Sequence, residues 1–489
     1  TLNLTLGNIT GSGTLTLGIG SPTTLTAIVT NGTIDPALAM AYNLNLVTYN
    51  LTYNNSTLAY TTSGELPSLA ATPPFAGTMT LANNQGVTLS NDGTIFNVTI
   101  NSLAGNILHL NGKILRLAGN FANNAVTINT MGLNASVANS KLHFIGTVYQ
   151  TIAFGNQTFT VPGLTAPDIE ISNNFFNNTT SCGASVTGTG SVKNVIVNSG
   201  AHFQIGAVNL NVMGDITNNG QLFTSGASTA SLITMTGTIA QTIGGSGSWN
   251  QIVTNPGVNR FTGFAINNTS GANPAVSLNQ SFALQNTLTL TAGILDGSGT
   301  LTLGNGTFST LTGLVTNGTI PLGGLTMAYN LNDATYNLTY NNSTAPYNSG
   351  GELPVIAATA PLAGTLTFAN NQGVTLSNDV CFFSTTINSL AGNIFHLNGN
   401  TLKVTGNFAN NAVTVNTMGL NASVAGSKLL FESANPQTFT TGNQTFAGVP
   451  NGPDVEINNS NAVSGLNLSS TNAYINHLTI NTSKYFQYT

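Results

Sequence analysis

Hydrophobic and polar residues alternate in short runs along most of the chain. Runs such as TLNLTL, NVTI and AVTINT place Leu, Ile or Val at every second position, with Thr, Asn or Ser between them. Because successive side chains of a β-strand point to opposite faces, this period predicts strands with one buried and one polar face. Gly, Asn-Gly and Ser-Gly steps separate the runs and supply the positive φ angles of tight turns. No long stretch has the helical spacing of apolar residues, so the sequence predicts an all-β protein.

Two all-β architectures fit this pattern. In a parallel β-helix, or β-solenoid, the short strands of consecutive coils stack into long sheets around a core. In a tandem β-sandwich array, domains of about 100 residues have longer strands and end in linkers. Turn signals recur here every ~8–12 residues, and proline clusters only near Pro73 and Pro74. We therefore predict a parallel β-helix built from short Thr/Asn/Gly-rich strands, with the tandem β-sandwich array as the alternative.

Long segments of the chain occur twice, at a constant offset of 286 to 287 residues. A constant offset indicates duplication of a whole structural unit. We divide the chain into a first full repeat unit, residues 1–286, and a partial second unit, residues 287–489, each predicted to be a β-solenoid. Since residues 207–286 have no second copy, we expect a window from a longer multi-unit chain, or a protomer that a neighbour completes. The matching segments include 11–34 with 297–320, and 119–138 with 406–425.

Charged residues make up 4 % of the chain, and the formal net charge is −5. Soluble domains usually carry about 25 % charged residues. Stacked coils explain the difference, because they place equivalent side chains about 4.8 Å apart, where like charges repel and uncharged Asn or Thr side chains can form ladders. Nucleic-acid binding needs clustered basic residues, whereas Arg116, Arg260 and the lysines lie scattered. No window is long and apolar enough to predict a membrane span.

Several repeated segments resemble one group of known proteins. The segments TYNLTYNNST, GELP, NNQGVTLSND and GSGTLTLG are similar to those of the long secreted β-strand-repeat surface and adhesin-like proteins of Bacteroidetes bacteria. The resemblance extends over most of the chain. It implies a secreted, extracellular or cell-surface location, and it brings no catalytic or cofactor-binding residues with it.

The best carboxylate pair is Asp168 with Glu170 in PDIEI, which recurs as Asp454 with Glu456 in PDVEI. Residues i and i+2 of a strand share a face, so each pair is a weak candidate for Ca²⁺ binding. The simpler interpretation is a half-buried strand whose inward Ile and Val alternate with outward acids. Asp92 and Asp379 lie in matching SND segments, where we expect turn residues.

No other constellation predicts catalysis, a cofactor or a metal centre, and we expect a protein that is not an enzyme. His109 and His396 lie between apolar neighbours without a second ligand at metal spacing, which favours histidines on a strand surface. Cys182 and Cys381 lie in dissimilar contexts. We favour two separate buried thiols, with a disulfide as the open alternative.

Asn-x-Ser/Thr sequons are abundant, and an extracellular chain could carry N-linked glycans at some of them. The sequons that we single out are Asn3, Asn8, Asn31, Asn50, Asn97, Asn134 and Asn156.

The function that the sequence favours is structural. We expect a protein of an extracellular filament, sheath or surface fibre that assembles with itself, head to tail, by stacking of β-strands. The alternative is a cell-surface adhesin stalk that binds glycans or surfaces through exposed aromatic residues. The candidates for that patch are Trp249 with Tyr329, Tyr336 and Tyr340. The tyrosines recur as Tyr42, Tyr49 and Tyr53, which favours a repeated structural role for them.

A more remote alternative is an ice-binding solenoid. Thr-x-Thr pairs such as Thr14 with Thr16 and Thr300 with Thr302 could present hydroxyl groups to a crystal lattice. An ice-binding face needs such pairs aligned in consecutive coils. Their irregular spacing along the sequence argues against that alignment.

Overall fold

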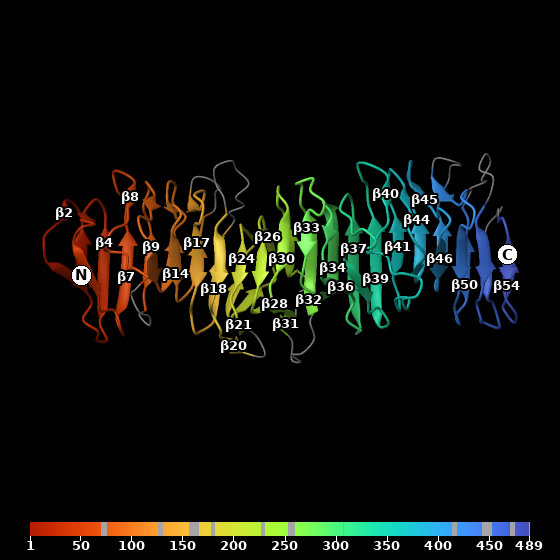
Figure 1. The fold of residues 1–489 in the computed structure, drawn as a ribbon, viewed down its shortest axis with the longest axis horizontal. Coiled ribbons are helices and arrows are strands. Elements are labelled where there is room, and N and C mark those ends of the chain that lie inside the picture. The colour runs from red at the N-terminus through yellow and green to blue at the C-terminus, as the bar shows by residue number, and fades with distance from the viewer. Residues whose placement is uncertain are drawn as a thin grey trace. The chain divides into compact units, whose positions relative to one another are not determined.

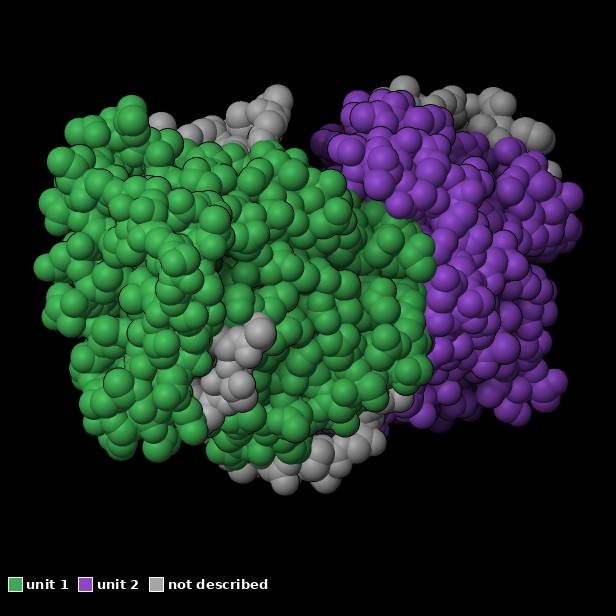
Figure 2. Space-filling view, turned by 60° about the vertical axis from the view of Figure 1, so that its left-hand side comes forward, with its two compact units in different colours: residues 1–236, 241–262 green, residues 237–240, 263–489 purple. Residues whose placement is uncertain are grey.

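The computed structural model describes most of the chain and divides it into two compact units (Figure 2). Unit 1 comprises residues 1–236 and 241–262, and unit 2 comprises residues 237–240 and 263–489. The described residues are 1–69, 76–125, 131–155, 166–177, 181–225, 230–252, 260–306, 308–412, 418–442, 452–469 and 475–488, with residues 251, 252 and 260 described by their backbone alone.

A turn of the chain contains two or three short strands, which pair with the equivalent strands of the next turn. In unit 1, β12 (Asn97–Ile100), β13 (Ile107–His109) and β14 (Ile114–Leu117) form one turn. They pair in parallel with β15 (Phe121–Asn123), β16 (Gly132–Asn134) and β17 (Lys141–Phe144) of the next. The fold is therefore the predicted parallel β-solenoid, with about 17 turns in all, and not a β-sandwich array. The described residues contain no helix, and hence none that could cross a membrane.

Three stacked sheets result in unit 1, and Figure 1 shows their strands in chain order. Sheet 1 consists of β1 (Leu2–Leu4), β4 (Thr24–Val29), β7 (Thr48–Tyr53), β9 (Thr78–Leu81), β12, β15, β18 (Gln150–Ala153), β22 (Ala184–Val186), β25 (His202–Ile205), β28 (Gln221–Ser225) and β31 (Ser248–Ile252). Sheet 2 consists of β11 (Gly93–Ile95), β14, β17, β19 (Asp168–Ile171), β24 (Val195–Val197), β27 (Ile216–Asn218) and β30 (Gln241–Gly244). Sheet 3 consists of β8 (Tyr60–Thr61), β10 (Val87–Thr88), β13 and β16.

Shorter ladders complete unit 1. They are β23 (Gly190–Val192) with β26 (Asn209–Val212) and β29 (Leu232–Met235), β2 (Asn8–Ile9) with β5 (Thr33–Ile34), and β3 (Thr14–Leu17) with β6 (Ala39–Tyr42). The strands β20 (Phe176–Asn177) and β21 (Ser181–Cys182) pair antiparallel. The strand β32 (Arg260–Asn267) contributes residues to both units.

Unit 2 has the same three-sheet arrangement. Its sheet 1 consists of β34 (Phe282–Ala292), β37 (Ser309–Val315), β39 (Ala334–Tyr340), β41 (Thr365–Phe368), β44 (Ser384–Ile387), β47 (Phe408–Asn410), β50 (Gln437–Thr440), β52 (Leu466–Leu468) and β54 (Phe486–Tyr488). Its sheet 2 consists of β43 (Val380–Phe382), β46 (Thr401–Val404), β49 (Lys428–Phe431), β51 (Asp454–Ile457) and β53 (Leu478–Ile480). Its sheet 3 consists of β40 (Tyr347–Asn348), β42 (Val374–Thr375), β45 (Ile394–His396) and β48 (Gly419–Asn421). The remaining strands are β33 (Val276–Leu278) with β35 (Leu295–Asp296), and β36 (Thr300–Leu303) with β38 (Thr326–Tyr329).

The two sequence copies fold in the same register. Leu2 pairs with Ala27 in the first copy, and Leu288 pairs with Gly313 at the equivalent positions of the second. The repeat boundary between residues 286 and 287 falls inside the single strand β34. The sequence repeat is therefore a period of the solenoid and does not end at a break in the backbone ladder.

Alternation along each strand separates the core from the surface, as predicted. In β39, Tyr336, Leu338 and Tyr340 are fully buried, whereas the Thr and Asn side chains between them lie outside. The length of a turn varies, because Val186 pairs with Ile205, 19 residues later, and with Ile152, 34 residues earlier. The loops absorb this variation, so the strands keep their register.

Buried amide side chains connect consecutive turns at the corners. The Asn83 Oδ1 atom accepts a hydrogen bond from the Gln85 backbone N–H at 2.7 Å, and its Nδ2 donates to the Asn54 carbonyl of the preceding turn at 3.0 Å. Asn370 makes the equivalent two bonds in the second copy. Because an amide both donates and accepts, one side chain satisfies two turns at a corner that water does not reach.

We expect Asn83→Ala to destabilise its own turn by about 2 kcal/mol, because it leaves buried backbone groups unpaired. Amide hydrogen exchange over residues 78–92 measures this as faster exchange. Asn91→Ala removes an exposed amide nearby and serves as the control, with a change below about 0.5 kcal/mol. Equal exchange in the two variants would contradict the proposed role of the corner amide.

Candidate functional site

The outer face of sheet 2 carries the predicted carboxylate pair of unit 1. Asp168 and Glu170 lie half-buried on β19 and point outward, whereas Ile169 and Ile171 of the same strand are fully buried. The β51 strand of unit 2 has the same alternation, with Asp454 and Glu456 outward. Each pair thus shares one face of a strand, as the spacing of the two residues predicts.

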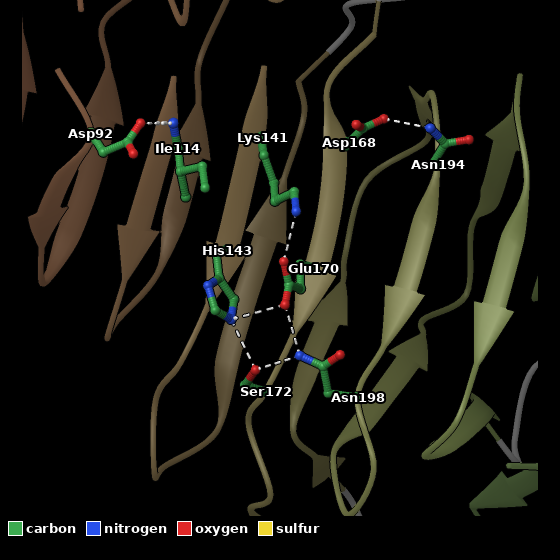
Figure 3. Close-up of polar contacts among 9 residues, drawn as sticks. All are labelled: Asp92, Ile114, Lys141, His143, Asp168, Glu170, Ser172, Asn194 and Asn198. Carbon is green, nitrogen blue, oxygen red and sulfur yellow. Dashed lines mark hydrogen bonds and ion pairs between the residues drawn. The ribbon is translucent and has the colours of Figure 1, made fainter. Parts of the chain in front are cut away.

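Glu170 lies at the centre of a polar cluster that three consecutive turns contribute (Figure 3). Its Oε2 atom lies 2.8 Å from the Lys141 Nζ, and its Oε1 accepts a hydrogen bond from the Asn198 Nδ2 at 2.8 Å. The same Nδ2 group donates to the Ser172 Oγ at 2.8 Å. A cation on one side and an amide on the other therefore bind the two carboxylate oxygens.

His143 lies beside this cluster and contacts Ser172, a pair that the sequence analysis did not find. Its Nε2 lies 2.8 Å from the Ser172 Oγ and 3.8 Å from the Glu170 Oε1. A serine and a histidine at that distance fit a nucleophile and its base. In a catalytic triad, however, the carboxylate orients the imidazole through its other nitrogen. Here the carboxylate approaches the same nitrogen as the serine, which fits a cross-strand contact better than a triad.

The second copy keeps the ion pair and changes the histidine. The Lys428 Nζ lies 3.0 Å from the Glu456 Oε2, and the Asn481 Nδ2 donates to the Glu456 Oε1 at 3.1 Å. Leu430 pairs with Glu456 in the register that His143 has with Glu170. The Lys–Glu–Asn arrangement is therefore common to both copies, whereas the Ser–His contact belongs to the first alone.

Aspartate side chains at the starts of the strands bond to the next turn, two of them to its backbone and one to a side chain. The Asp92 Oδ1 accepts from the Ile114 N–H at 2.8 Å, and the Asp379 Oδ1 accepts from the Thr401 N–H at 2.7 Å (Figure 3 shows the first bond). The Asp168 Oδ1 accepts from the Asn194 Nδ2 at 2.8 Å. The sequence predicts turn residues at Asp92 and Asp379, and the structure shows that each joins one turn to the next.

The hydrogen bonds on this face determine how its groups ionise. Burial raises the pKa of the Glu170 carboxyl, but the hydrogen bonds from Lys141 and Asn198, together with the charge interactions with His143 and Lys141, lower it overall. The hydrogen bond from Lys428 lowers the pKa of Glu456 in the same way. Burial lowers the pKa of His143, against the attraction of Glu170. The face therefore carries ionised carboxylates that local donors neutralise.

These donors occupy the carboxylate oxygens that a Ca²⁺ ion would need. Calcium takes six to eight oxygen ligands, whereas Glu170 and Glu456 each contact an amine and an amide. Within the described ranges, His, Cys, Asp and Glu form no group of three that could hold a metal ion. Calcium binding at Asp168, Glu170, Asp454 and Glu456 stays a prediction.

A small hollow lies beside Asp168. It has a volume of about 100 Å³ and is lined by residues 135–140 with Ala166, Asp168 and Lys193. Pockets for organic ligands usually measure about 300–1,000 Å³. This one has room for a few water molecules, which agrees with a polar surface rather than with a substrate site.

The remaining single residues are placed as follows. His109 and His396 lie half-buried on the outer side of β13 and β45, and burial lowers the pKa of both. Cys182 and Cys381 are free, buried thiols, which confirms the favoured interpretation. Burial raises the pKa of the Cys381 thiol to about 11.

The aromatic patch expected for a glycan-binding stalk is not on the surface. Trp249, Tyr336 and Tyr340 are fully buried, as are Tyr49 and Tyr53 in the first copy. Because Tyr and Leu alternate with Thr and Asn in TYNLTY, the tyrosines lie on the same inward face as the leucine. Tyr329 is half-buried, and its hydroxyl donates to the Gly351 and Leu353 carbonyls. These positions agree with the structural role that the recurrence of the tyrosines favours.

The sequons differ in how far their side chains are engaged. Asn3 and Asn8 are exposed, and the Asn8 Oδ1 accepts a hydrogen bond from Thr33. Asn31, Asn50, Asn97 and Asn134 are half-buried and take part in hydrogen bonds with Thr57, Thr78, Asn120 and Ser136 respectively. Asn156 lies outside the described residues.

Comparison of the chain with protein-family models, with curated proteins and with solved structures finds no match. The resemblance to Bacteroidetes surface proteins therefore stays a prediction, and the site has to be interpreted from its own geometry.

We expect Glu170→Gln to lower the free energy of unfolding by about 1 kcal/mol or less at neutral pH, because a half-buried ion pair contributes little more. The folded carboxyl has a lowered pKa, so its contribution is present above the ordinary value of 4.5 and is lost as the pH falls through the folded pKa. Denaturation of parent and variant at neutral and acid pH checks this. Glu456→Gln is the matched variant in the second copy, and a difference that persists in acid would contradict the assignment.

Proposed function

We propose that the chain is a structural protein of an extracellular filament, sheath or surface fibre. The observation that carries the proposal is that the bonds between turns are the same in both sequence copies. Parallel pairing, the corner amides Asn83 and Asn370, and the ion pairs of Lys141 and Lys428 all recur. A chain whose repeated features connect turn to turn is suited to bearing load along its stack.

The proposed mechanism is mechanical and involves no catalysis. The three sheets of each unit run their backbone hydrogen bonds along the stack, so a pull in that direction loads many bonds at once. Fully buried Leu, Ile, Val and Phe side chains fill the space that the sheets enclose. The outer surface is rich in uncharged Asn and Thr, and with 4 % charged residues in the chain it offers few charges to repel a neighbouring copy.

The partner that this geometry favours is a second copy of the chain, joined head to tail. An outermost strand presents unpaired N–H and C=O groups, and parallel in-register pairing suits a strand of the same type. The secreted or cell-surface location is part of the same proposal and rests on the resemblance given above. The adhesin stalk stays the alternative, although Trp249, Tyr336 and Tyr340 are fully buried and do not form its aromatic patch.

We expect purified chain to form fibres, with a repeat of about 4.8 Å along the fibre axis in X-ray diffraction. Asn3→Pro in β1 and Phe486→Pro in β54 each remove a backbone donor that faces away from the neighbouring strand, and we expect shorter fibres. Asn3→Ala and Phe486→Ala keep that donor and are the matched controls. Discrete particles from the unmodified chain would contradict assembly, and glycan binding by such particles would indicate the adhesin stalk.

Ice binding is a second candidate, which one observation favours. In sheet 1 of unit 2, two adjacent outward rows of mainly Thr residues lie in register across consecutive turns, in contrast to the irregular spacing expected from the sequence. Of the Thr-x-Thr residues singled out in the sequence, Thr300 pairs with Thr326, whereas Thr302, Thr14 and Thr16 pair with Ala residues. The first row consists of Thr289, Leu314, Thr339, Thr367, Thr386, Ala409 and Thr440. The second row consists of Thr287, Thr312, Asn337, Thr365 and Ser384.

The two rows repeat at about 4.8 Å along the stack and lie about 6.6 Å apart along each strand. If this lattice binds ice, the chain lowers the freezing point of water below its melting point, and Thr367→Tyr in the middle of a row reduces that difference by more than half. Thr375→Tyr, on the outward side of β42 in sheet 3, is the control. Equal activity of the two variants, or none in the parent, would exclude this face.

A further inference from the structure

A glutamate from the repeated GELP segment is fully buried in each copy. Glu65 and Glu352 have no exposed surface, and tyrosine hydroxyl groups hold their loops against the core. The Tyr49 hydroxyl donates to the Glu65 carbonyl at 2.7 Å, and the Tyr336 hydroxyl donates to the Glu352 carbonyl at 2.8 Å. A buried carboxyl group is costly when charged and unpaired, so its partners decide its state.

One oxygen of each carboxyl group accepts two hydrogen bonds. The Glu352 Oε1 accepts from the Gly350 backbone N–H at 2.8 Å and from the Tyr340 hydroxyl at 2.6 Å. The Glu65 Oε1 accepts from the Ser63 N–H at 2.9 Å and from the Tyr53 hydroxyl at 3.0 Å. In both copies Oε1 therefore acts as an acceptor alone, as the carbonyl oxygen of a carboxylic acid does.

The other oxygen, Oε2, is buried in both copies without a hydrogen-bond partner among the described residues. The Tyr347 hydroxyl lies near the Glu352 carboxyl and donates its hydrogen to the Gly318 carbonyl at 3.0 Å. In the first copy the equivalent Tyr60 hydroxyl is likewise buried without a partner in the described part of the chain. A carboxylate would place part of its charge on an unpaired buried oxygen, whereas a carboxylic acid carries no charge there.

The groups that face the two carboxyls supply no positive charge. Glu65 faces Tyr42, Tyr49, Tyr53 and Tyr60. Glu352 faces the equivalent residues Tyr329, Tyr336, Tyr340 and Tyr347, with Cys381 next to Tyr329. Tyrosine and cysteine are neutral at physiological pH. These surroundings contrast with Glu170, which pairs with a lysine.

We propose that Glu65 and Glu352 are protonated in the folded chain and act as pH-sensitive clasps, whose ionisation releases residues 61–69 and 348–356 from the core. Each clasp joins a loop to the tyrosines of neighbouring strands through the hydroxyl bonds to Oε1 and to the glutamate carbonyl. Loss of the acid proton leaves a charge in a buried, tyrosine-lined space where the described residues place no cation. The proposal is independent of whether the chain forms fibres or binds ice.

The expected pH dependence has a definite sign. Burial raises the pKa of both glutamates above the ordinary value of 4.5. The stabilisation is therefore fully present below the unfolded pKa and is lost as the pH rises through the folded pKa. In that window each clasp makes the opening equilibrium about tenfold more favourable per pH unit. This is opposite to the sign expected for Glu170.

Glutamine tests the proposal, because it keeps an acceptor at Oε1 and places an N–H donor where the acid has its O–H. We expect Glu65→Gln, Glu352→Gln and the double variant to fold, and to be more stable than the parent at mildly alkaline pH. Hydrogen exchange over residues 61–69 and 348–356, corrected for the intrinsic effect of pH, should rise with pH in the parent and stay flat in the double variant. Glu170→Gln is the control that keeps the parental rise.

Infrared absorption of protonated carboxyl groups gives a second readout that does not depend on stability. The parent should show this band at neutral pH, and the double variant should lack it. Tyr340→Phe, which removes one donor to Oε1, should weaken the clasp of the second copy alone. A parent without the band, or glutamine variants that exchange faster than the parent at every pH, would overturn the proposal.

Discussion

The buried polar groups of a turn need hydrogen-bond partners, and the turns directly before and after it supply many of them. The sheets do this for the backbone of the strands, but the corners would leave buried groups unpaired. An amide side chain meets this need because it donates and accepts at once. Asn173 donates to the Val148 carbonyl and accepts from the Phe175 N–H, and Asn459 does the same at the equivalent corner. The high Asn content is therefore a requirement of stacking.

The same requirement governs where charges can lie. Equivalent positions are about one strand spacing apart, so a charge is tolerated where the next turn supplies its opposite. Lys141 pairs in register with Asp168 and bonds to Glu170, which keeps the signs alternating along the face. Glu65 has tyrosines in place of a lysine, and its pKa shifts the other way. The pKa values of two glutamates in one fold thus shift in opposite directions because their neighbouring turns differ.

The sequence predicts what lies within a strand better than what lies between turns. The period of two places Ile169 inward and Glu170 outward, and the leucine in TYNLTY marks the buried face that its tyrosines share. Contacts between turns depend on register, and register depends on loops that make turns of unequal length. The contact of His143 with Ser172 follows from that register. So do the two outward rows of mainly Thr residues in unit 2, one of which includes Thr367. For this reason, periodicity alone does not reveal them.

The duplicated copies separate what this fold requires from what it tolerates. Leu430 and Asn458 stand where the first copy has His143 and Ser172, so the solenoid forms without that contact. Glu65 and Glu352 are retained with all of their tyrosines, although glutamine would offer the same acceptor and a donor. A buried amide would cost less at neutral pH than a group that can ionise. Retention of the acid in both copies therefore favours a role for its titration over a role in packing alone.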